Sequence, residues 1–409
     1  MTGKLKLQDL SDFFKQHGPT CVHAPSGMLK YRFVTPSYAV KAGADDTAQV
    51  AERSTTGHYL QMYDWDASFF SQAAHQIGIE DLPLDVVANF LSLKRPDGHI
   101  PRTVSPQRVW DAGDQCKPFL TQTVLKAIGG RAQELIPKLL DDLDCYLRYF
   151  ERERKSQWGL YKWRNVLESG VDDNLALIAP REAAKDEDDS IGRFPDGEIL
   201  AVDLSIYLAK EFASFAQLTK RYKREDAGKY QDMADQVIAA VEEHLWCDKT
   251  GIYLNYNPVD KCLVPVKSWT SLAPVIMGLA PESRAHRVIK DYMINPDHFL
   301  APCGIASHDL AEPLANQQRR GLYGRAIVSN WQGPVWILTN ALCVRALKHY
   351  GFTKEARDVS ERVCRTLLDS IANTGTLYEN YDAISGKPLW APQFMSWNIL
   401  ALELIETLA

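Results

Sequence analysis

Three carboxylates lie close together between residues 161 and 174, where the chain reads YKWRNVLESGVDDN. Glu168, Asp172 and Asp173 follow the aromatic residues Tyr161 and Trp163 and precede an apolar run. Carboxylates transfer protons and aromatic rings stack on the CH faces of sugars, so this combination suits the cleavage of a sugar derivative. A polar loop between two helices would have a similar composition. The stretch alone leaves both interpretations open.

A second segment that combines a carboxylate with aromatic neighbours occurs much later in the chain. Glu379 lies between Tyr378 and Tyr381 in a segment that continues to the aromatic residue Trp397. A solvated glutamate is the simple interpretation of Glu379. Paired with one of the earlier acids, it would supply the second carboxyl that glycoside hydrolysis requires.

Tyr63-Asp-Trp-Asp66 is a third segment of this kind, at the start of an apolar helical pattern. Either aspartate could cap the helix. Alternatively, Asp66 accepts hydrogen bonds from sugar hydroxyls while Tyr63 and Trp65 stack on the sugar ring. Beside the other two segments, we favour the binding role.

Two further loops add polar candidates. Gln115 to Gln122 opens a helix and contains Lys117, which is either a solvated lysine or a cation that faces the site. Ser329 to Trp336 leads into another helix and brings Trp331 and Gln332 just ahead of it.

The elements that must position these residues are helices. Apolar residues recur at i, i+3 and i+4 along most of the chain, which predicts about twelve amphipathic helices. Strand-like alternation is confined to short pieces such as Ile252–Tyr256. The predicted helices span 7–16, 65–77, 84–93, 118–128, 132–154, 199–222, 225–245, 268–279, 282–294, 333–350, 354–371 and 394–408.

The loops between these helices alternate between short ones and long aromatic ones, as in a barrel of helical hairpins whose long loops meet at one mouth. Three loops share a pattern in which a long helix is followed by glycine and then tyrosine: Gly159 to Tyr161, Gly251 to Tyr253 and Gly375 to Tyr378. Each glycine would permit the left-handed turn that ends a helix. Repeated hairpins would bring the acids after the first and third loops to the same mouth.

Composition excludes several classes of protein. The net charge of −6 argues against a nucleic-acid or anionic-membrane surface. The eight cysteines contain no CxxC pair and the histidines are dispersed, so we expect reduced thiols, no metal and no cofactor.

No apolar run has the length of a signal peptide or a membrane span, which predicts a soluble, cytoplasmic protein. Length alone suggests two or three domains, but no linker divides the chain, so we predict one domain over 1–409.

Four sequence motifs, taken in their order along the chain, resemble those of a known enzyme family. YDWD, ESGVDDN, NWQGPVW and ENYDAISG, followed by FMSW, occur in the order and at roughly the spacing seen in glycoside hydrolase family 63. They are also similar to motifs of the trehalases and of the processing α-glucosidase I. A chain of this size resembles the mannosylglycerate and glucosylglycerate hydrolases of that family. The resemblance implies an all-α (α/α)6 barrel and inverting hydrolysis of an α-glycoside.

Carried over by motif, the resemblance implies that Asp172 is the general acid and Glu379 the general base. Asp173 stands where asparagine is common, and Gln332 stands where arginine is common. We place Asp172 ahead of Asp173 as the acid and regard Glu168 as a structural hydrogen-bonding residue. The predicted substrate-binding residues are Tyr63, Trp65, Asp66, Lys117, Gln122, Trp163, Arg193, Trp331, Gln332, Tyr378 and Trp397.

The expected substrate is a small glycoside, with mannosylglycerate or glucosylglycerate first. A glycerate carboxylate would need a cation or several donors, for which the candidates are Lys117, Arg193, Arg319, Arg320 and Arg325. A general α-glucosidase or trehalase-like enzyme is the first alternative. A sugar epimerase or isomerase could use the same barrel with a pair from His58, His99 and His308, and a sugar-binding barrel without activity is a third alternative. Oligomeric state stays open.

Overall fold

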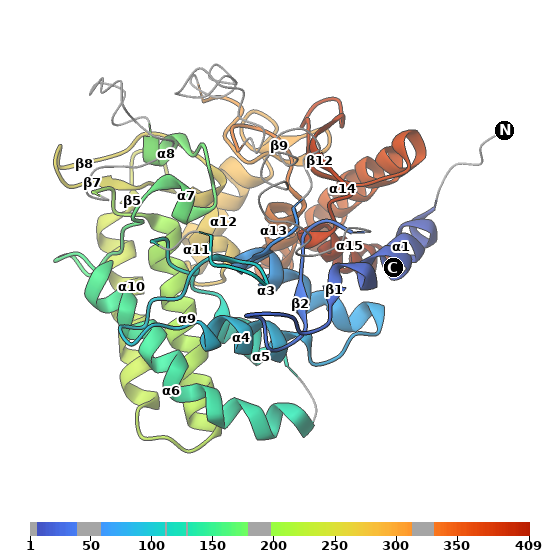
Figure 1. Ribbon diagram of the computed structural model, residues 1–409. Helices are drawn as coiled ribbons and strands as arrows, with labels where there is room; N and C mark the ends of the chain where they lie inside the picture. Colours follow the sequence, from blue (N-terminus) through green and yellow to red (C-terminus); the bar gives the residue numbers. More distant parts are fainter. Residues whose placement is uncertain (1–5, 39–58, 111–112, 128–129, 179–197, 313–330) are drawn as a thin grey trace, which may run out of the picture.

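The computed structural model describes residues 6–38, 59–110, 113–127, 130–178, 198–312 and 331–409. Within these ranges, six helical segments form a closed inner ring in which each contacts the next and the last contacts the first. The segments, in ring order, are α3 (Asp64–Ala73), α5 (Leu120–Leu125), α9 (Val202–Arg221), η4 with α11 (Trp269–Leu272 and Ala273–Ile276), α13 (Ile337–His349) and η6 with α15 (Ser396–Leu400 and Ala401–Leu408). Figure 1 labels the α-helices of this ring, α3, α5, α9, α11, α13 and α15.

Six outer helices pack behind this ring, each beside an inner partner. They are α1 (Leu7–His17), α4 (Leu82–Ser92), α6 (Gly130–Glu153), α10 (Ala227–His244), α12 with the π-helical turn η5 (Glu282–Val288 and Ile289–Met293) and α14 (Thr353–Thr374). The burial pattern separates the two rings. In α3 every residue except Gln72 is buried, whereas α10 buries one stripe, Tyr230, Ala234, Val237 and Val241, at helical spacing.

All twelve predicted helices are present in the described part of the chain, but several of them begin later than the sequence suggests. The segment 268–279 opens as a 3₁₀ turn, and α13 begins at Ile337 instead of Gly333. Val335 explains the late start of α13, because it forms backbone bridges with Ala306 and Tyr381 and cannot also be helical.

Strands are short, as the sequence suggests, and most of them pair with a strand close by along the chain. The described residues contain six two-stranded antiparallel ladders. They are β1 (Val22–His23) with β2 (Phe33–Val34), β3 (Met62–Tyr63) with β4 (Thr103–Val104), β5 (Trp246–Cys247) with β6 (Ile252–Tyr253), β7 (Tyr256–Asn257) with β8 (Cys262–Leu263), β9 (Leu300–Ala301) with β10 (Gly304–Ile305), and β11 (Tyr378–Tyr381) with β12 (Pro388–Pro392). By contrast, β3 and β4 pair across α3 and α4, which lie between them in the chain. Short turns η1 (Gly18–Cys21), η2 (Ala74–Ile77), α7 (Val166–Ser169) and α8 (Leu175–Ile178) complete the described elements.

The three predicted glycine turns share one conformation. Gly159, Gly251 and Gly375 have φ of 75°, 73° and 72°, in the left-handed region that favours glycine. They follow α6, α10 and α14, which are all outer helices. Gly375 is the C-cap of α14, as predicted. Gly159 and Gly251 do not end a helix, because α6 already ends at Glu153 and α10 at His244, and these two glycines form turns in the loops that follow.

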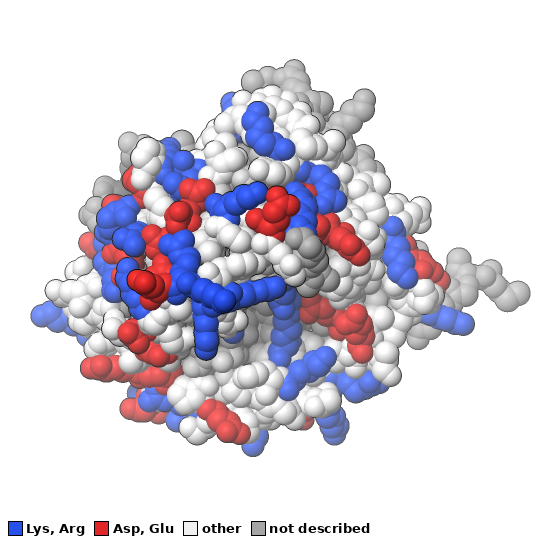
Figure 2. Space-filling model, turned by 90° about the horizontal axis from the view of Figure 1, so that it is seen from below, with Lys and Arg blue, Asp and Glu red and all other residues white. Residues whose placement is uncertain are grey.

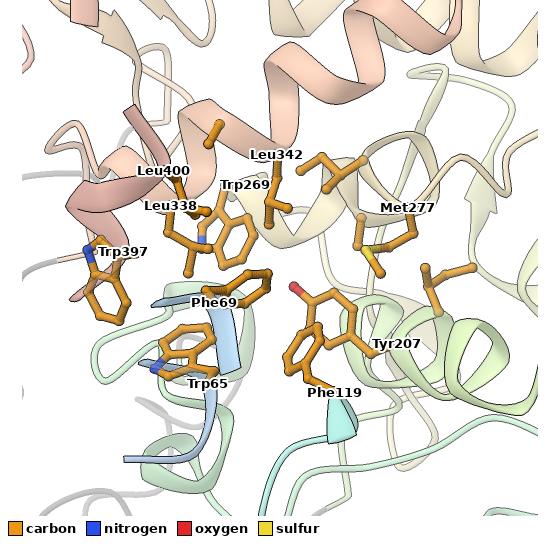
Figure 3. Packing of buried hydrophobic residues seen from close by; sticks show 14 of the residues in the cluster. Trp65, Phe69, Phe119, Tyr207, Trp269, Met277, Leu338, Leu342, Trp397 and Leu400 are labelled. Atoms are coloured by element: carbon orange, nitrogen blue, oxygen red, sulfur yellow. The ribbon is translucent and has the colours of Figure 1, made fainter. Parts of the chain in front are cut away.

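The centre of the ring is filled with large apolar side chains (Figure 3). Every inner segment contributes to this packing, including Trp65 and Phe69 from α3, Tyr207 from α9 and Trp397 from η6. On the face shown in Figure 2, acidic and basic side chains are intermixed, and Lys and Arg gather around a hollow near its centre. Within the described residues, no helix combines the length and the apolar character needed to cross a membrane.

Candidate active site

The N-terminal ends of the inner segments meet at one end of the barrel, which we call the mouth. In Figure 3, the indole nitrogens of Trp65, Trp269 and Trp397 all lie on the side where their helical segments begin. Helix N-termini carry partial positive charge, so the mouth is a favourable place for carboxylates.

Five tryptophans form a connected cluster at the mouth. Trp331 stacks on Trp336, with ring centroids 3.8 Å apart and an interplanar angle of 8°. Its ring is also 5.6 Å from Trp65 and 5.7 Å from Trp269, and Trp397 lies 5.6 Å from both Trp65 and Trp336. Residues from several inner segments and the loop before α13 thus build a single aromatic cluster, in which all five rings are buried.

The loop that carries Asp172 is fixed against this cluster. Asn165 caps α7 by accepting a hydrogen bond from Glu168 N at 2.7 Å, and Gly170 ends the turn with φ of 76°. A Cβ atom on Gly170 would lie 2.7 Å from Lys117 Cε and 2.8 Å from Trp65 Cζ2. Only glycine allows both this conformation and this close approach.

Glu168 holds the loop in place. Its buried carboxylate accepts hydrogen bonds from the backbone of Gln115 at 2.9 Å and of Arg164 at 2.6 Å. Arg154 Nη2 donates a third at 2.7 Å. These bonds favour the structural role expected for Glu168.

Asp172 and Asp173 differ in their surroundings. Asp173 is buried, and its Oδ1 accepts a hydrogen bond of 2.7 Å from Trp331 N. Gln332 Nε2 donates to the carbonyl of Asp173 at 3.0 Å. Burial raises the pKa of Asp173 to about 8. Asp172 is only partly buried, so it is the more accessible of the two.

Glu379 reaches the mouth on β11. It is buried, and its Oε1 accepts a hydrogen bond of 3.0 Å from the hydroxyl of Tyr59. The strand is attached to the segment before α13, because Val335 and Tyr381 exchange two backbone hydrogen bonds of 2.8 and 3.0 Å. Since Trp331 in the same segment is bonded to Asp173, a short path joins the loop of Asp172 to the strand of Glu379.

The start of α3 contributes two more carboxylates. Asp66 is buried and accepts a hydrogen bond of 2.7 Å from Ser396 Oγ. Burial raises its pKa to about 7. Asp64 binds the ammonium of Lys117 at 3.1 Å, and both side chains are almost completely inaccessible to solvent. The Lys117 ammonium also lies 4.8 Å from the centre of the Trp65 ring.

The other predicted site residues have mixed surroundings. Trp163 Nε1 donates to Asp203 at 3.1 Å, and the Tyr63 hydroxyl donates to Gln61 at 3.1 Å. The side-chain amide of Gln122 donates to the carbonyl of Pro118 one turn earlier, at 3.1 Å. Tyr378 is partly buried beside Glu379. Arg193, Arg319, Arg320, Arg325 and His58 lie outside the described residues.

Four residues at the mouth were missed by sequence reasoning: Tyr59, Asp64, Asp203 and Ser396. Tyr59 precedes the YDWD motif without belonging to it, and Asp203 has the appearance of an ordinary acid in the first turn of a helix. Ser396 lies beside Trp397 and could have been found from the FMSW motif. Asp64 was noticed only as a helix cap, since no pattern connects it with Lys117.

Comparison with known proteins decides the family. A family model described as the mannosylglycerate hydrolase MGH1-like glycoside hydrolase domain matches residues 59–397. The chain belongs to this family. This mannosylglycerate hydrolase-like glycoside hydrolase is 23% identical to the mannosylglycerate hydrolase of Rubrobacter radiotolerans over 54% of this chain and 47% of that protein. It is also 23% identical to a probable mannosyl-oligosaccharide glucosidase of Schizosaccharomyces pombe, over 63% of this chain and 31% of that protein. The chain thus spans about a third to a half of these relatives.

Solved structures support the fold. A family 63 mannosylglycerate hydrolase from Thermus thermophilus, in complex with glucose, has a TM-score of 0.72 at 18% identity and covers 98% of this chain and 100% of its own. The neutral trehalase from Saccharomyces cerevisiae has a TM-score of 0.69 at 16% identity and covers 93% of this chain and 74% of its own. Together with the closed inner ring, these likenesses confirm the predicted (α/α)6 barrel.

Proposed function

We propose that this glycoside hydrolase cleaves a small α-glycoside with inversion of configuration at the anomeric carbon, and that mannosylglycerate or glucosylglycerate is its preferred substrate. Asp172 is the general acid and Glu379 the general base. The observation that carries the proposal is that the chain segment from Trp331 to Val335 is hydrogen-bonded to Asp173 at one end and to Tyr381 at the other, which supports two carboxyls at one aromatic mouth.

In this mechanism Asp172 donates its proton to the glycosidic oxygen as the bond to the anomeric carbon breaks. Glu379 removes a proton from a water molecule, whose oxygen attacks that carbon from the opposite face. The products are the β-anomer of the hexose and glycerate. The mechanism needs a separation of about 6.5–9.5 Å between the two carboxyl groups, so that water fits beside the base.

The substrate class is argued from chemistry and relatives. Tryptophan rings beside the buried acceptor Asp66 suit a single sugar ring, because aromatic rings stack on CH faces and a carboxylate accepts hydrogen bonds from hydroxyl groups. The names of the relatives from Rubrobacter and Thermus favour a glycerate aglycone. Lys117 is a weak candidate for binding the glycerate carboxylate directly, since Asp64 already binds its buried ammonium.

Incubation with mannosylglycerate, glucosylglycerate and trehalose, followed by measurement of released hexose and glycerate, tests the proposal. We expect release from at least one glycerate glycoside and none with Asp172→Asn or Glu379→Gln. Turnover of trehalose or a glucobiose alone would favour a general α-glucosidase. Conversion of one sugar into another without bond cleavage would favour an isomerase, although burial lowers the pKa of His308, one of its candidate acid–base residues, to about 4. Normal sugar binding without turnover would favour a binding protein.

A further inference from the structure

Asp203 is a buried carboxylate at the mouth that the mechanism above does not use. It lies in the first turn of α9, on the inner ring, and is 2% exposed. Its Oδ1 accepts two hydrogen bonds, from Trp163 Nε1 at 3.1 Å and from the backbone of Leu204 at 2.8 Å. Its Oδ2 is equally buried and has no hydrogen-bond partner among the residues that the structure describes.

The backbone around Asp203 is fixed on both sides. Val202 N donates to Asn255 Oδ1 at 2.9 Å, and Asn255 Nδ2 donates to the carbonyl of Ala176 at 3.2 Å, just after the loop of Asp172. Tyr161 N donates to Ser205 Oγ at 3.0 Å. These bonds tie the start of α9 to both ends of the acid-bearing stretch, so the carboxylate keeps its position.

The unused oxygen requires a donor. Burial raises the pKa of Asp203 to about 6, so the group is still mostly ionised at neutral pH. An ionised carboxylate only accepts hydrogen bonds, and a buried acceptor without a partner is costly. The positive charge of Lys117 acts on Asp203, but Asp64 already binds that ammonium at 3.1 Å.

The neighbours of Asp203 are aromatic. Trp163 is bonded to its Oδ1, and Tyr207 lies one turn further along α9, where its ring is 4.9 Å from that of Phe119 in the barrel centre (Figure 3). An unpartnered acceptor beside ring surfaces is an arrangement that binds a hydroxyl of a stacked sugar. We propose that Oδ2 of Asp203 accepts a hydrogen bond from one hydroxyl of the hexose bound at the mouth, which makes Asp203 a substrate-binding and specificity-determining residue. This inference rests on the proposed function, because it assumes a hexose as ligand.

Asp203→Asn tests the inference with little change in shape. The variant keeps an oxygen that can accept from Trp163 and Leu204, and it replaces the unused acceptor with an amide donor. Trp163→Phe is the matched control, because it removes the bond to Oδ1 and leaves Oδ2 unchanged. Titrations with D-glucose and D-mannose measure binding, and kcat/KM is measured on the preferred glycoside and on each of its monodeoxy analogues.

We expect Asp203→Asn to weaken hexose binding and kcat/KM by about 10- to 100-fold, the value of a hydrogen bond to a charged group. The wild type should lose a similar factor on one monodeoxy analogue, and Asp203→Asn should lose nothing more on that analogue. Trp163→Phe should keep the discrimination against the same analogue.

Three results would overturn the inference. The first is unchanged binding and kcat/KM in Asp203→Asn, which would mean that Oδ2 is satisfied from within the protein. The second is an equal loss in both variants with discrimination intact, which would mean that Asp203 only holds Trp163. The third is a wild type that binds no hexose. If the wild type binds hexose but cleaves no glycoside, the proposed function fails while the binding titrations still decide the role of Asp203.

Discussion

Replacement of Asp173 by asparagine tests which of two adjacent carboxyls transfers the proton. Asp173 Oδ1 accepts the backbone N–H of Trp331 at 2.7 Å, and the oxygen of an asparagine side chain can accept the same bond. We therefore expect Asp173→Asn to keep kcat/KM within about 10-fold of the wild type. Asp172→Asn removes the proton donor and should lower kcat by about 10²- to 10⁴-fold, the usual contribution of general acid–base catalysis.

Asp173→Ala supplies the structural control and a magnitude. It leaves the N–H of Trp331 buried without a partner, which costs about 1–3 kcal/mol. Unfolding entropy of about 2.1 cal/mol/K per residue gives roughly 0.9 kcal/mol/K for 409 residues. The alanine variant should therefore lower Tm by about 1–4 °C, as measured by calorimetry, whereas the asparagine variant should not.

The pH dependence of stability has a definite sign. The pKa of Asp173 is raised from 3.8 to about 8 in the folded protein. The stability it contributes is fully present below its ordinary pKa and is lost as pH rises toward 8. Asparagine does not titrate, so Asp173→Asn should gain stability relative to the wild type between pH 4 and 8, by at most about 1.4 kcal/mol for each pH unit. Urea unfolding at several pH values measures this difference.

The opposite pattern of activities would refute the assignment. If Asp173→Asn abolished hydrolysis and Asp172→Asn retained it, the general acid would be Asp173, one residue later in the chain than we propose. Equal and severe losses in both variants, with normal Tm values, would indicate that the two carboxyls act together.

Three further predictions concern the support of the site. Lys117→Met leaves buried Asp64 without its counter-ion, which costs about 3–5 kcal/mol and should lower Tm by about 3–6 °C. Adding Asp64→Asn to this variant should restore most of the lost Tm. A Lys117→Met variant with the Tm of the wild type would contradict the buried ion pair. Gly170→Ala should lower both kcat/KM and Tm, since its Cβ has no room, and wild-type kinetics would show that the approach is looser. Tyr59→Phe removes the hydroxyl that donates to Glu379, so kcat should fall by about 10- to 100-fold with a smaller change in KM; a change confined to KM would make Tyr59 a substrate ligand only.

The helices were predictable because their apolar spacing reflects one-sided or complete burial, and the left-handed turns at the three glycines because glycine adopts positive φ at the least cost. The start of α13 was not predictable from the sequence, because Val335 is held in an extended conformation by Ala306 and Tyr381, which are distant in sequence. The same limit applies to the mouth. The ion pair of Asp64 with Lys117 is a tertiary contact that leaves no mark on local spacing.

The order of the motifs points to Asp172 and Glu379 as the catalytic pair, and this assignment stays a prediction. The contacts of Glu168 became visible only in three dimensions. Asp203 was missed because an acid in the first turn of a helix is common for local reasons. Its unused oxygen can be recognised only once the surrounding residues are known.

The stereochemistry of the first product tests the central claim most directly. Proton NMR during the first minutes of hydrolysis of mannosylglycerate or glucosylglycerate distinguishes the two anomers of the released hexose before they equilibrate. Attack of water activated by Glu379, opposite a leaving group protonated by Asp172, predicts that the β-anomer appears first and that neither Asp172→Asn nor Glu379→Gln releases it. Initial release of the α-anomer, or release of hexose by either variant at the wild-type rate, would contradict the account.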